Sequence, residues 1–205
     1  MKVAIVGGTG AFGLALTHRL VEAGDEVVIG SRDPVRAAEK AEEACASGGA
    51  ANEEAVRGVD LVVLATKAEA TLETAAALAD ALGGTPLLSV ASELHFSAAG
   101  ALPGGAERSL AERTQELLRA PVAAGLHSLA AGRLARGRLD EDAFVCGDAE
   151  AKEAALELAA KVVAGRALDA GPLASARALE GMTAVIVNLN KRYKGHAGLR
   201  VTGLP

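Results

Sequence analysis

Short apolar runs alternate with longer amphipathic stretches through the first half of the chain. The apolar runs are rich in Val, Ile and Leu, which predicts buried strands at residues 2–6, 26–30, 59–64 and 86–90. The Ala-rich stretches between them carry charges on one side and predict helices at residues 11–23, 34–46, 52–57 and 68–82. Regular alternation of strand and helix is typical of a parallel sheet joined by right-handed crossovers. We therefore predict a Rossmann-type, doubly wound α/β fold.

The second half begins with a segment that has no clear period. Residues 91–107 contain Gly100, Pro103, Gly104 and Gly105, which predicts a long loop. Beyond it the pattern predicts helices at 108–119, 149–163 and 173–192, and strands at 121–125, 143–146 and 166–169. We expect residues 1–147 to form a nucleotide-binding Rossmann domain and residues 148–205 to form a small C-terminal helical extension.

The final helix carries an apolar stripe, which covers a core or meets a partner. Its members recur every three or four residues, and they are Leu179, Met182, Ile186, Leu189 and Tyr193.

Composition narrows the class of protein further. Half of the 205 residues are hydrophobic but only 2% are aromatic, so the core is built from Ala, Val and Leu. The net charge of −5, with no dense basic block, argues against nucleic-acid binding. No apolar run approaches the ~20 residues of a membrane helix, and the first run breaks at Gly7, too early for a signal peptide. With two cysteines that lack metal-ligand neighbours, we expect a cytoplasmic protein without a metal site.

A glycine turn follows the first predicted strand. Gly8-Thr9-Gly10-Ala11-Phe12-Gly13 fits the pattern G-x-G-x-x-G, and a strand, a helix and a second strand surround it as a dinucleotide site requires. Gly8 permits a tight turn, Gly10 lets the backbone approach a pyrophosphate, and Gly13 lets the helix pack closely on the strand. The helix N-terminus then favours the bound anion through its free N–H groups and dipole.

The choice between NAD and NADP is made at the end of the second strand. Ser31 can donate to a 2′-phosphate, Arg32 can pair with it, and Arg36 can add a further positive charge. Asp33 could instead bind ribose hydroxyls, but Asp followed by Pro34 is a common helix start, so capping explains it. We therefore favour NADP(H).

Three further residues follow predicted strands and so lie at the carboxyl edge of the sheet. Thr66 and Lys67 follow the strand at 59–64, and either could contact the cofactor. His127 follows the strand at 121–125 and is a candidate site residue by the same reasoning. Motifs for a covalent nucleophile or a zinc protease, G-x-S-x-G and H-E-x-x-H, are absent from the sequence.

Over almost its whole length the chain resembles the F420-dependent NADP reductases. The similar segments are Val3–Gly10, Gly30–Arg32, Gly125–His127, Val145–Asp148, Leu168–Leu173, Leu189–Lys194 and Leu199–Leu204. The resemblance implies reversible hydride transfer between NADP(H) and coenzyme F420, a 5-deazaflavin, in a homodimer. It also implies that Gly8, Thr9 and Gly10 hold the pyrophosphate, and that Ser31 and Arg32 hold the 2′-phosphate.

For the deazaflavin site the resemblance implies His127 beside the ring, Leu129 packing nearby and a hydroxyl from Thr183. Archaeal members tend to have Pro where this chain has Lys67 and Ser where it has Gly181. Two alternatives stay open: an NADPH-dependent reductase of a small imine or carbonyl compound, and a non-catalytic NADP(H) sensor.

Overall fold

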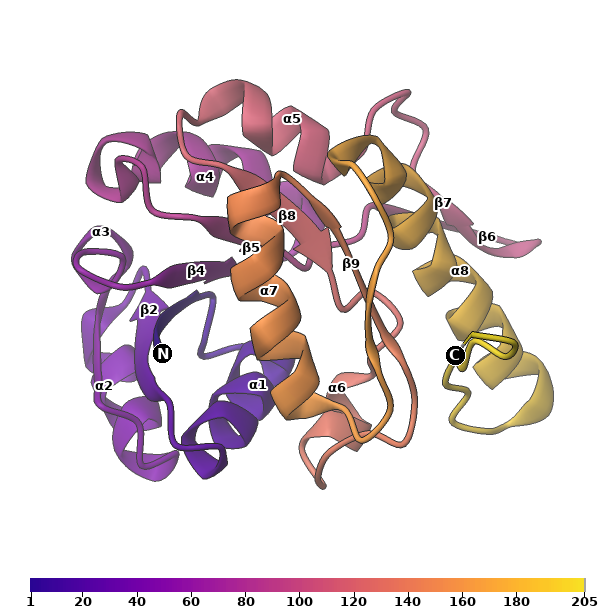
Figure 1. Ribbon diagram of the computed structural model, residues 1–205, viewed down its shortest axis with the longest axis horizontal. Coiled ribbons are helices and arrows are strands. Elements are labelled where there is room, and N and C mark those ends of the chain that lie inside the picture. The colour runs from indigo at the N-terminus through magenta and orange to yellow at the C-terminus, as the bar shows by residue number, and fades with distance from the viewer. Residues whose placement is uncertain (205) are drawn as a thin grey trace.

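A computed structural model describes residues 1–204, and a single large sheet runs through it (Figure 1). Among the described residues its eight strands lie in the order β10-β9-β8-β5-β4-β1-β2-β3. Their bounds are β1 Lys2–Val6, β2 Glu26–Ser31, β3 Gly48–Ala51, β4 Leu61–Leu64, β5 Leu87–Ser89, β8 Val122–Gly125, β9 Ala143–Gly147 and β10 Ala167–Asp169. All neighbouring strands pair in parallel except β8 and β9, so the predicted Rossmann-type α/β fold is confirmed.

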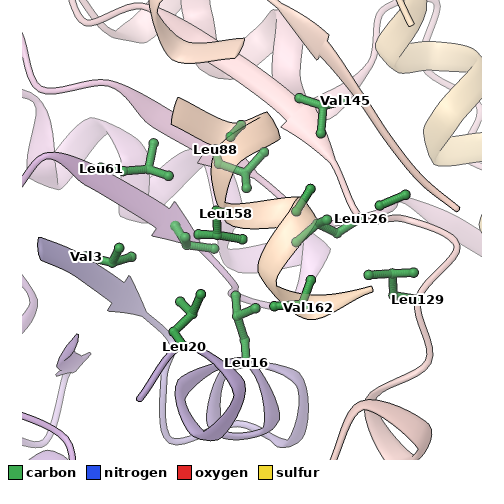
Figure 2. Close-up of a cluster of buried hydrophobic side chains, with 14 of the residues drawn as sticks. Val3, Leu16, Leu20, Leu61, Leu88, Leu126, Leu129, Val145, Leu158 and Val162 are labelled. Carbon is green, nitrogen blue, oxygen red and sulfur yellow. The ribbon is translucent and has the colours of Figure 1, made fainter. Parts of the chain in front are cut away.

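Helices cover both faces of this sheet. They are α1 Ala11–Glu22, α2 Pro34–Glu43, α3 Asn52–Ala55, α4 Ala68–Leu82, α5 Leu110–Leu117, α6 Ala131–Leu134, α7 Ala149–Val162 and α8 Ala176–Tyr193. Apolar residues of α1 and α7 form one core with alternate strand residues, while α4, α5 and the start of α8 form the other. Figure 2 shows the first core, where Leu16 and Leu20 of α1 face Leu158 and Val162 of α7. These two layers hold the strands rigidly, so the turns at their carboxyl ends are fixed in place.

Strand β3 was not predicted, because Gly48-Gly49-Ala50-Ala51 lacks the branched side chains that signal a strand. Its glycines have a packing reason. A Cβ on Gly49 would lie 2.2 Å from the backbone carbonyl carbon of Ala37. The absence of a side chain therefore lets α2, which carries Arg36, lie directly against the edge of the sheet.

The antiparallel strand β9 departs from the all-parallel prediction. It pairs with β8 through Ala123↔Gly147 and Gly125↔Val145. Antiparallel neighbours need only a short turn, yet residues 126–142 form a long connection from the carboxyl end of β8 to β9. This connection contains His127 and the short helix α6.

The prediction of an irregular loop at residues 91–107 was wrong. An antiparallel hairpin forms there, with β6 at Leu94–Ser97 and β7 at Gly100–Pro103. Asn188 of α8 fixes the hairpin, since its amide oxygen accepts from the Ala101 N–H at 2.9 Å and its amide nitrogen donates to the Ala101 carbonyl at 2.8 Å. Sequence periodicity could not reveal this pairing, because the hairpin packs on a helix that comes much later in the chain.

The apolar stripe of helix α8 is buried in the protein over part of its length and exposed to solvent at its C-terminal end. Leu179 and Ile186 of the predicted stripe are buried, whereas Tyr193 is 75% exposed. In Figure 1, α8 and the hairpin lie together at one side of the molecule, away from α2 and β3. The segment from residue 148 also supplies β10 to the main sheet and α7 to the core on one face of it. Its division from residues 1–147 as a separate part stays a prediction.

Candidate functional site

The glycine turn packs backbone against backbone. Gly7 has a φ of +81°, and a Cβ there would lie 2.7 Å from the Ala65 carbonyl oxygen. A Cβ on Gly13 would meet the Gly7 carbonyl oxygen and the Gly8 Cα at 2.7 Å each. Gly7 is thus the residue that needs the left-handed backbone, and Gly13 allows α1 to approach the turn closely.

A cavity of about 710 Å³ opens beside this turn. Its lining comes from the turn, the β2–α2 connection with the start of α2, Asn52, and the β4–α4 connection with the start of α4, which includes the acidic Glu69. Of the residues predicted for cofactor binding, Thr9, Gly10, Ser31, Arg32, Arg36, Thr66 and Lys67 line the cavity. The carboxyl ends of β1, β2 and β4 therefore bring together a backbone elbow and three cationic side chains, as binding of a phosphorylated nucleotide requires.

The other four residues of the glycine turn lie outside the lining, and so does Leu129, which is buried in the core. Gly8 is buried, and a Cβ there would meet Ile5 and Ile29. Phe12 packs against the core, while Ala11 begins α1 and Gly13 supports the close packing described above. The G-x-G-x-x-G pattern therefore contains residues that line the cavity and other residues that only shape the turn.

The end of β2 has the arrangement expected from its sequence. Asp33 caps α2, accepting hydrogen bonds from the N–H groups of Val35 at 3.1 Å and Arg36 at 3.2 Å. The Ser31 hydroxyl accepts from the Asp33 N–H at 3.2 Å. Since capping occupies one carboxylate oxygen of Asp33, Arg32 and Arg36 give this end of the cavity its positive character.

Asn52 was missed by sequence reasoning. It is the first residue of α3 and is only 8% exposed, yet its Oδ1 has no hydrogen-bond partner. It lines the cavity, and a Cβ on Gly30 would lie 3.1 Å from that oxygen. Buried acceptors are normally paired, so Asn52 is an additional candidate for binding a hydroxyl or amino group. A polar residue directly after a strand would have marked Asn52 as a candidate. The sequence did not reveal it because β3 itself was not predicted.

The β4–α4 connection is held by a short chain of hydroxyl groups. Thr71 donates to the Lys67 carbonyl at 3.0 Å, and the Thr66 and Thr71 hydroxyls lie 3.1 Å apart. Lys67 is exposed at the cavity and directly precedes α4. The chain thus positions the backbone while leaving the ammonium group free to turn toward an anion.

A second polar group lies farther along the same edge of the sheet. His127 follows β8, Ser92 follows β5, and Thr183 belongs to α8. The Ser92 hydroxyl lies 3.2 Å from His127 Nδ1 and 2.7 Å from Thr183 Oγ1. Thr183 also donates to the His127 carbonyl at 2.8 Å. The two predicted catalytic residues are thus in contact, and Ser92, which the sequence did not single out, joins them.

The turn that carries His127 has an unusual backbone. Leu126 has a φ of +64°, which is rare for a branched, bulky residue. Its side chain is buried in the core shown in Figure 2, and so is that of Leu129. The core therefore holds the backbone in this conformation and sets the direction of His127.

Burial controls the charge of His127. Desolvation lowers its pKa from 6.5 to about 4, and the backbone of Val90 opposes this shift. The imidazole is therefore neutral near pH 7, and its Nε2 is buried without a partner.

Across residues 1–204 no group of three or more His, Cys, Asp or Glu side chains is placed to hold a metal. None of the helices in that range is both long and apolar enough to span a membrane.

Comparison with known proteins places the chain in a family of reductases. Residues 2–93 match the family described as NADP oxidoreductase, coenzyme F420-dependent. The F420-dependent NADP reductase of Methanothermobacter thermautotrophicus is 34% identical over all of this chain and 96% of its own length. The reductase of the same name from Methanocaldococcus jannaschii is 33% identical over all of this chain and 99% of its own length.

Solved structures show the same fold. A putative F420-dependent NADP reductase from an Arthrobacter species has a TM-score of 0.86 and 28% identity, with 99% of this chain and all of that chain covered. An imine reductase from Bacillus cereus has a TM-score of 0.64 and 17% identity, with 94% and 62% covered, so it shares the fold alone.

The lowered pKa of His127 predicts a pH-dependent stability. Between pH 6.5 and about 4 the unfolded chain protonates this histidine while the folded protein does not. The unfolded state then binds more protons, so the free energy of unfolding decreases as the pH falls through this window, by up to about 1.4 kcal/mol per pH unit. Urea titrations across the window should show a shallower slope for His127→Gln. The slope for His95→Gln, at an exposed histidine, should match the wild type; identical slopes for all three proteins would contradict the prediction.

Proposed function

Because this chain belongs to the F420-dependent NADP reductases, we propose that it transfers a hydride reversibly between NADP(H) and coenzyme F420. The chain is an oxidoreductase that uses these two molecules as its small-molecule substrates. The observation that carries the proposal is the cavity in which the glycine turn meets Ser31 and Arg32.

The charges around this cavity support the choice of NADP(H). A 2′-phosphate carries negative charge and several acceptor oxygens, which suits the Ser31 hydroxyl and the Arg32 guanidinium. Arg36 and Lys67 line the same cavity and add positive charge. Gly10 lies beside them, where its N-terminal position on α1 favours the pyrophosphate.

The hydride site is best placed at Ser92, His127 and Thr183. These residues follow β5 and β8 or face them from α8, and β5 lies next to β4, whose following loop lines the cavity. A dinucleotide whose adenosine end lies by Arg32 would extend along the sheet edge toward this cluster. Hydride transfer needs two rings held face to face with water excluded, so neutral, buried groups suit it.

The differences from archaeal relatives fit this assignment. Lys67 faces the NADP cavity and not the His127 cluster, so it adds a positive charge where phosphates are expected. At Gly181 a Cβ would lie 3.6 Å from Pro103 Cγ of the hairpin. A side chain at this position would therefore make only an ordinary van der Waals contact with the hairpin. We propose that Ser92 and Thr183 supply the hydroxyl groups of the hydride site, where archaeal members also tend to have a serine at the position of Gly181.

The alternative functions rest on weaker observations. Imine and pyrroline-carboxylate reductases share the fold at 13–22% identity, and the chain spans 62–70% of their lengths. An NADP(H) sensor would need the cavity but not the Ser92–His127–Thr183 cluster. That cluster favours an enzyme.

Activity measurements test the proposed reaction directly. With NADPH and coenzyme F420, we expect the deazaflavin absorbance to decrease in proportion to protein concentration, because both rings bind in one cleft. With NADPH and a cyclic imine such as 1-pyrroline, we expect no consumption of NADPH above the uncatalysed rate. Turnover of the imine alone would support the reductase alternative, and NADPH binding without either reaction would support the sensor.

Arg32 should determine the preference for the phosphorylated cofactor. We expect Arg32→Ala to weaken NADPH binding by about 10–100-fold, the loss of one charge-assisted contact, and to change NADH binding little. Fluorescence titration with both cofactors measures this. Arg57→Ala, which removes an exposed arginine outside the cavity, is the matched control. Equal weakening for NADPH and NADH would refute the assignment of Arg32 to the 2′-phosphate.

We propose a cytoplasmic homodimer formed by the C-terminal part of the chain. Exposed apolar side chains lie on α8 (Val185, Leu189 and Tyr193), and Phe96 is exposed on the hairpin that packs against this helix. An apolar surface of this kind is typical of a subunit interface.

Sedimentation equilibrium should show a dimer for the wild type. Val185→Asp should shift the mass toward the monomer, because a charge at an apolar interface is costly to desolvate. Val35→Asp, at a residue of α2 that is 68% exposed, should remain a dimer. A monomeric wild type, or dissociation by the Val35 variant alone, would argue against this interface.

A further inference from the structure

Ser92 lies between His127 and Thr183 in a chain of hydrogen bonds that has only one consistent direction. We propose that Ser92 is a positioning residue that holds His127 in the tautomer with hydrogen on Nδ1. Nε2 then offers its lone pair to an N–H or O–H group of the ligand in the hydride site. Only the identity of that ligand rests on the proposed function, because the tautomer follows from this chain's own residues.

The direction follows from counting protons. A hydroxyl group has one hydrogen to donate and two lone pairs to accept with. Thr183 donates its hydrogen to the His127 carbonyl, which can only accept. The 2.7 Å contact between Thr183 and Ser92 therefore requires Ser92 to donate to Thr183. Ser92 has then no hydrogen left for His127 Nδ1, so Nδ1 must carry the hydrogen and donate to Ser92.

The opposite direction satisfies fewer groups. If Ser92 donated to Nδ1, Thr183 would have to donate to Ser92 to keep that contact. The Thr183 hydrogen bond to the His127 carbonyl would be lost, and Nε2 would carry a buried hydrogen without an acceptor. Buried donors without partners are rare in folded proteins, so the first arrangement is favoured.

The free lone pair of Nε2 is the feature that calls for a ligand. His127 is only 7% exposed, and its Nε2 has no hydrogen-bond partner. Ser128, the next residue, is 3% exposed, and its hydroxyl also has no partner. Two adjacent buried side chains thus each have one polar atom without a partner, His127 Nε2 and Ser128 Oγ, at the carboxyl edge of β8, where α/β sheets bind their ligands.

The surroundings prevent His127 from relaxing away from this arrangement. Its neighbour Leu126 has a left-handed backbone and a buried side chain, so the turn is held by the core. Thr183 comes from α8, and Ser92 from the segment between β5 and the hairpin. Three separate elements therefore set one imidazole, as preorganisation of a binding site requires.

Imidazole ¹⁵N NMR of the ligand-free protein near pH 7 tests the tautomer. Long-range ¹H–¹⁵N correlations distinguish hydrogen on Nδ1 from hydrogen on Nε2, and His127→Gln identifies the His127 signals among the four histidines. We expect Nδ1–H in the wild type. Ser92→Ala should shift the population toward Nε2–H, while Ser92→Thr, which keeps the hydroxyl, should behave as the wild type.

Thr183 provides a second, independent variant. Thr183→Val removes the acceptor that directs the Ser92 hydrogen, so Ser92 can donate to Nδ1 and Nε2–H should increase. Thr183→Ser should restore Nδ1–H. A wild-type protein in the Nε2–H form, or no tautomer change in either Ser92→Ala or Thr183→Val, would overturn the proposal. A purely structural role of Ser92 would change the melting temperature and leave the tautomer as it was.

Steady-state kinetics then test the ligand contact. Ser92→Ala should raise the KM for coenzyme F420 roughly tenfold, the loss of one buried hydrogen bond, and leave the KM for NADPH unchanged. Ser92→Thr should restore it, and an equal rise for both substrates would contradict the contact. If the wild type does not reduce F420, the proposed function fails while the NMR result still decides the tautomer.

Discussion

The close approach of backbone to backbone at the first turn is the constraint on which the site depends. Gly7 lies against the carbonyl of Ala65, and Gly13 lies against Gly7 and Gly8, at distances that a Cβ would reduce to 2.7 Å. These contacts bring the N-terminus of α1, the end of β2 and the β4–α4 connection around one cavity. A side chain at Gly7 or Gly13 would separate these segments, and with them the groups that we propose bind phosphate.

The carboxyl edge of the sheet is divided into two electrostatic environments. The end near β1, β2 and β4 is open to solvent and carries Arg32, Arg36 and Lys67. The end near β5 and β8 is buried, and its histidine is held neutral by desolvation. Phosphates are attracted by exposed cations, whereas hydride transfer between rings is favoured where water and stray protons are excluded. Under the proposed function, one sheet edge thus separates the groups that attract the cofactor from the place of reaction.

The antiparallel strand β9 and helix α8 complete the second environment. Between β8 and the antiparallel β9 the chain forms a long connection, which starts with the left-handed Leu126 and carries His127. Helix α8 then returns across this edge and contributes Thr183, while Asn188 holds the hairpin against the same helix. The C-terminal part therefore contributes a side chain to the proposed hydride site as well as surface to the proposed dimer.

The sequence by itself determined most of the strands and helices that build the main sheet and its two layers, the glycine turn and the capping role of Asp33, because these depend on periodicity and on neighbours a few residues apart. Family membership was also visible in its motifs, and the comparisons confirm it. Only the tertiary structure decided strand β3, the hairpin, the buried amide of Asn52 and the contact of Ser92 with His127 and Thr183. Those features join residues separated by up to 91 positions, and their local sequences carry no signal of the partner that each will meet.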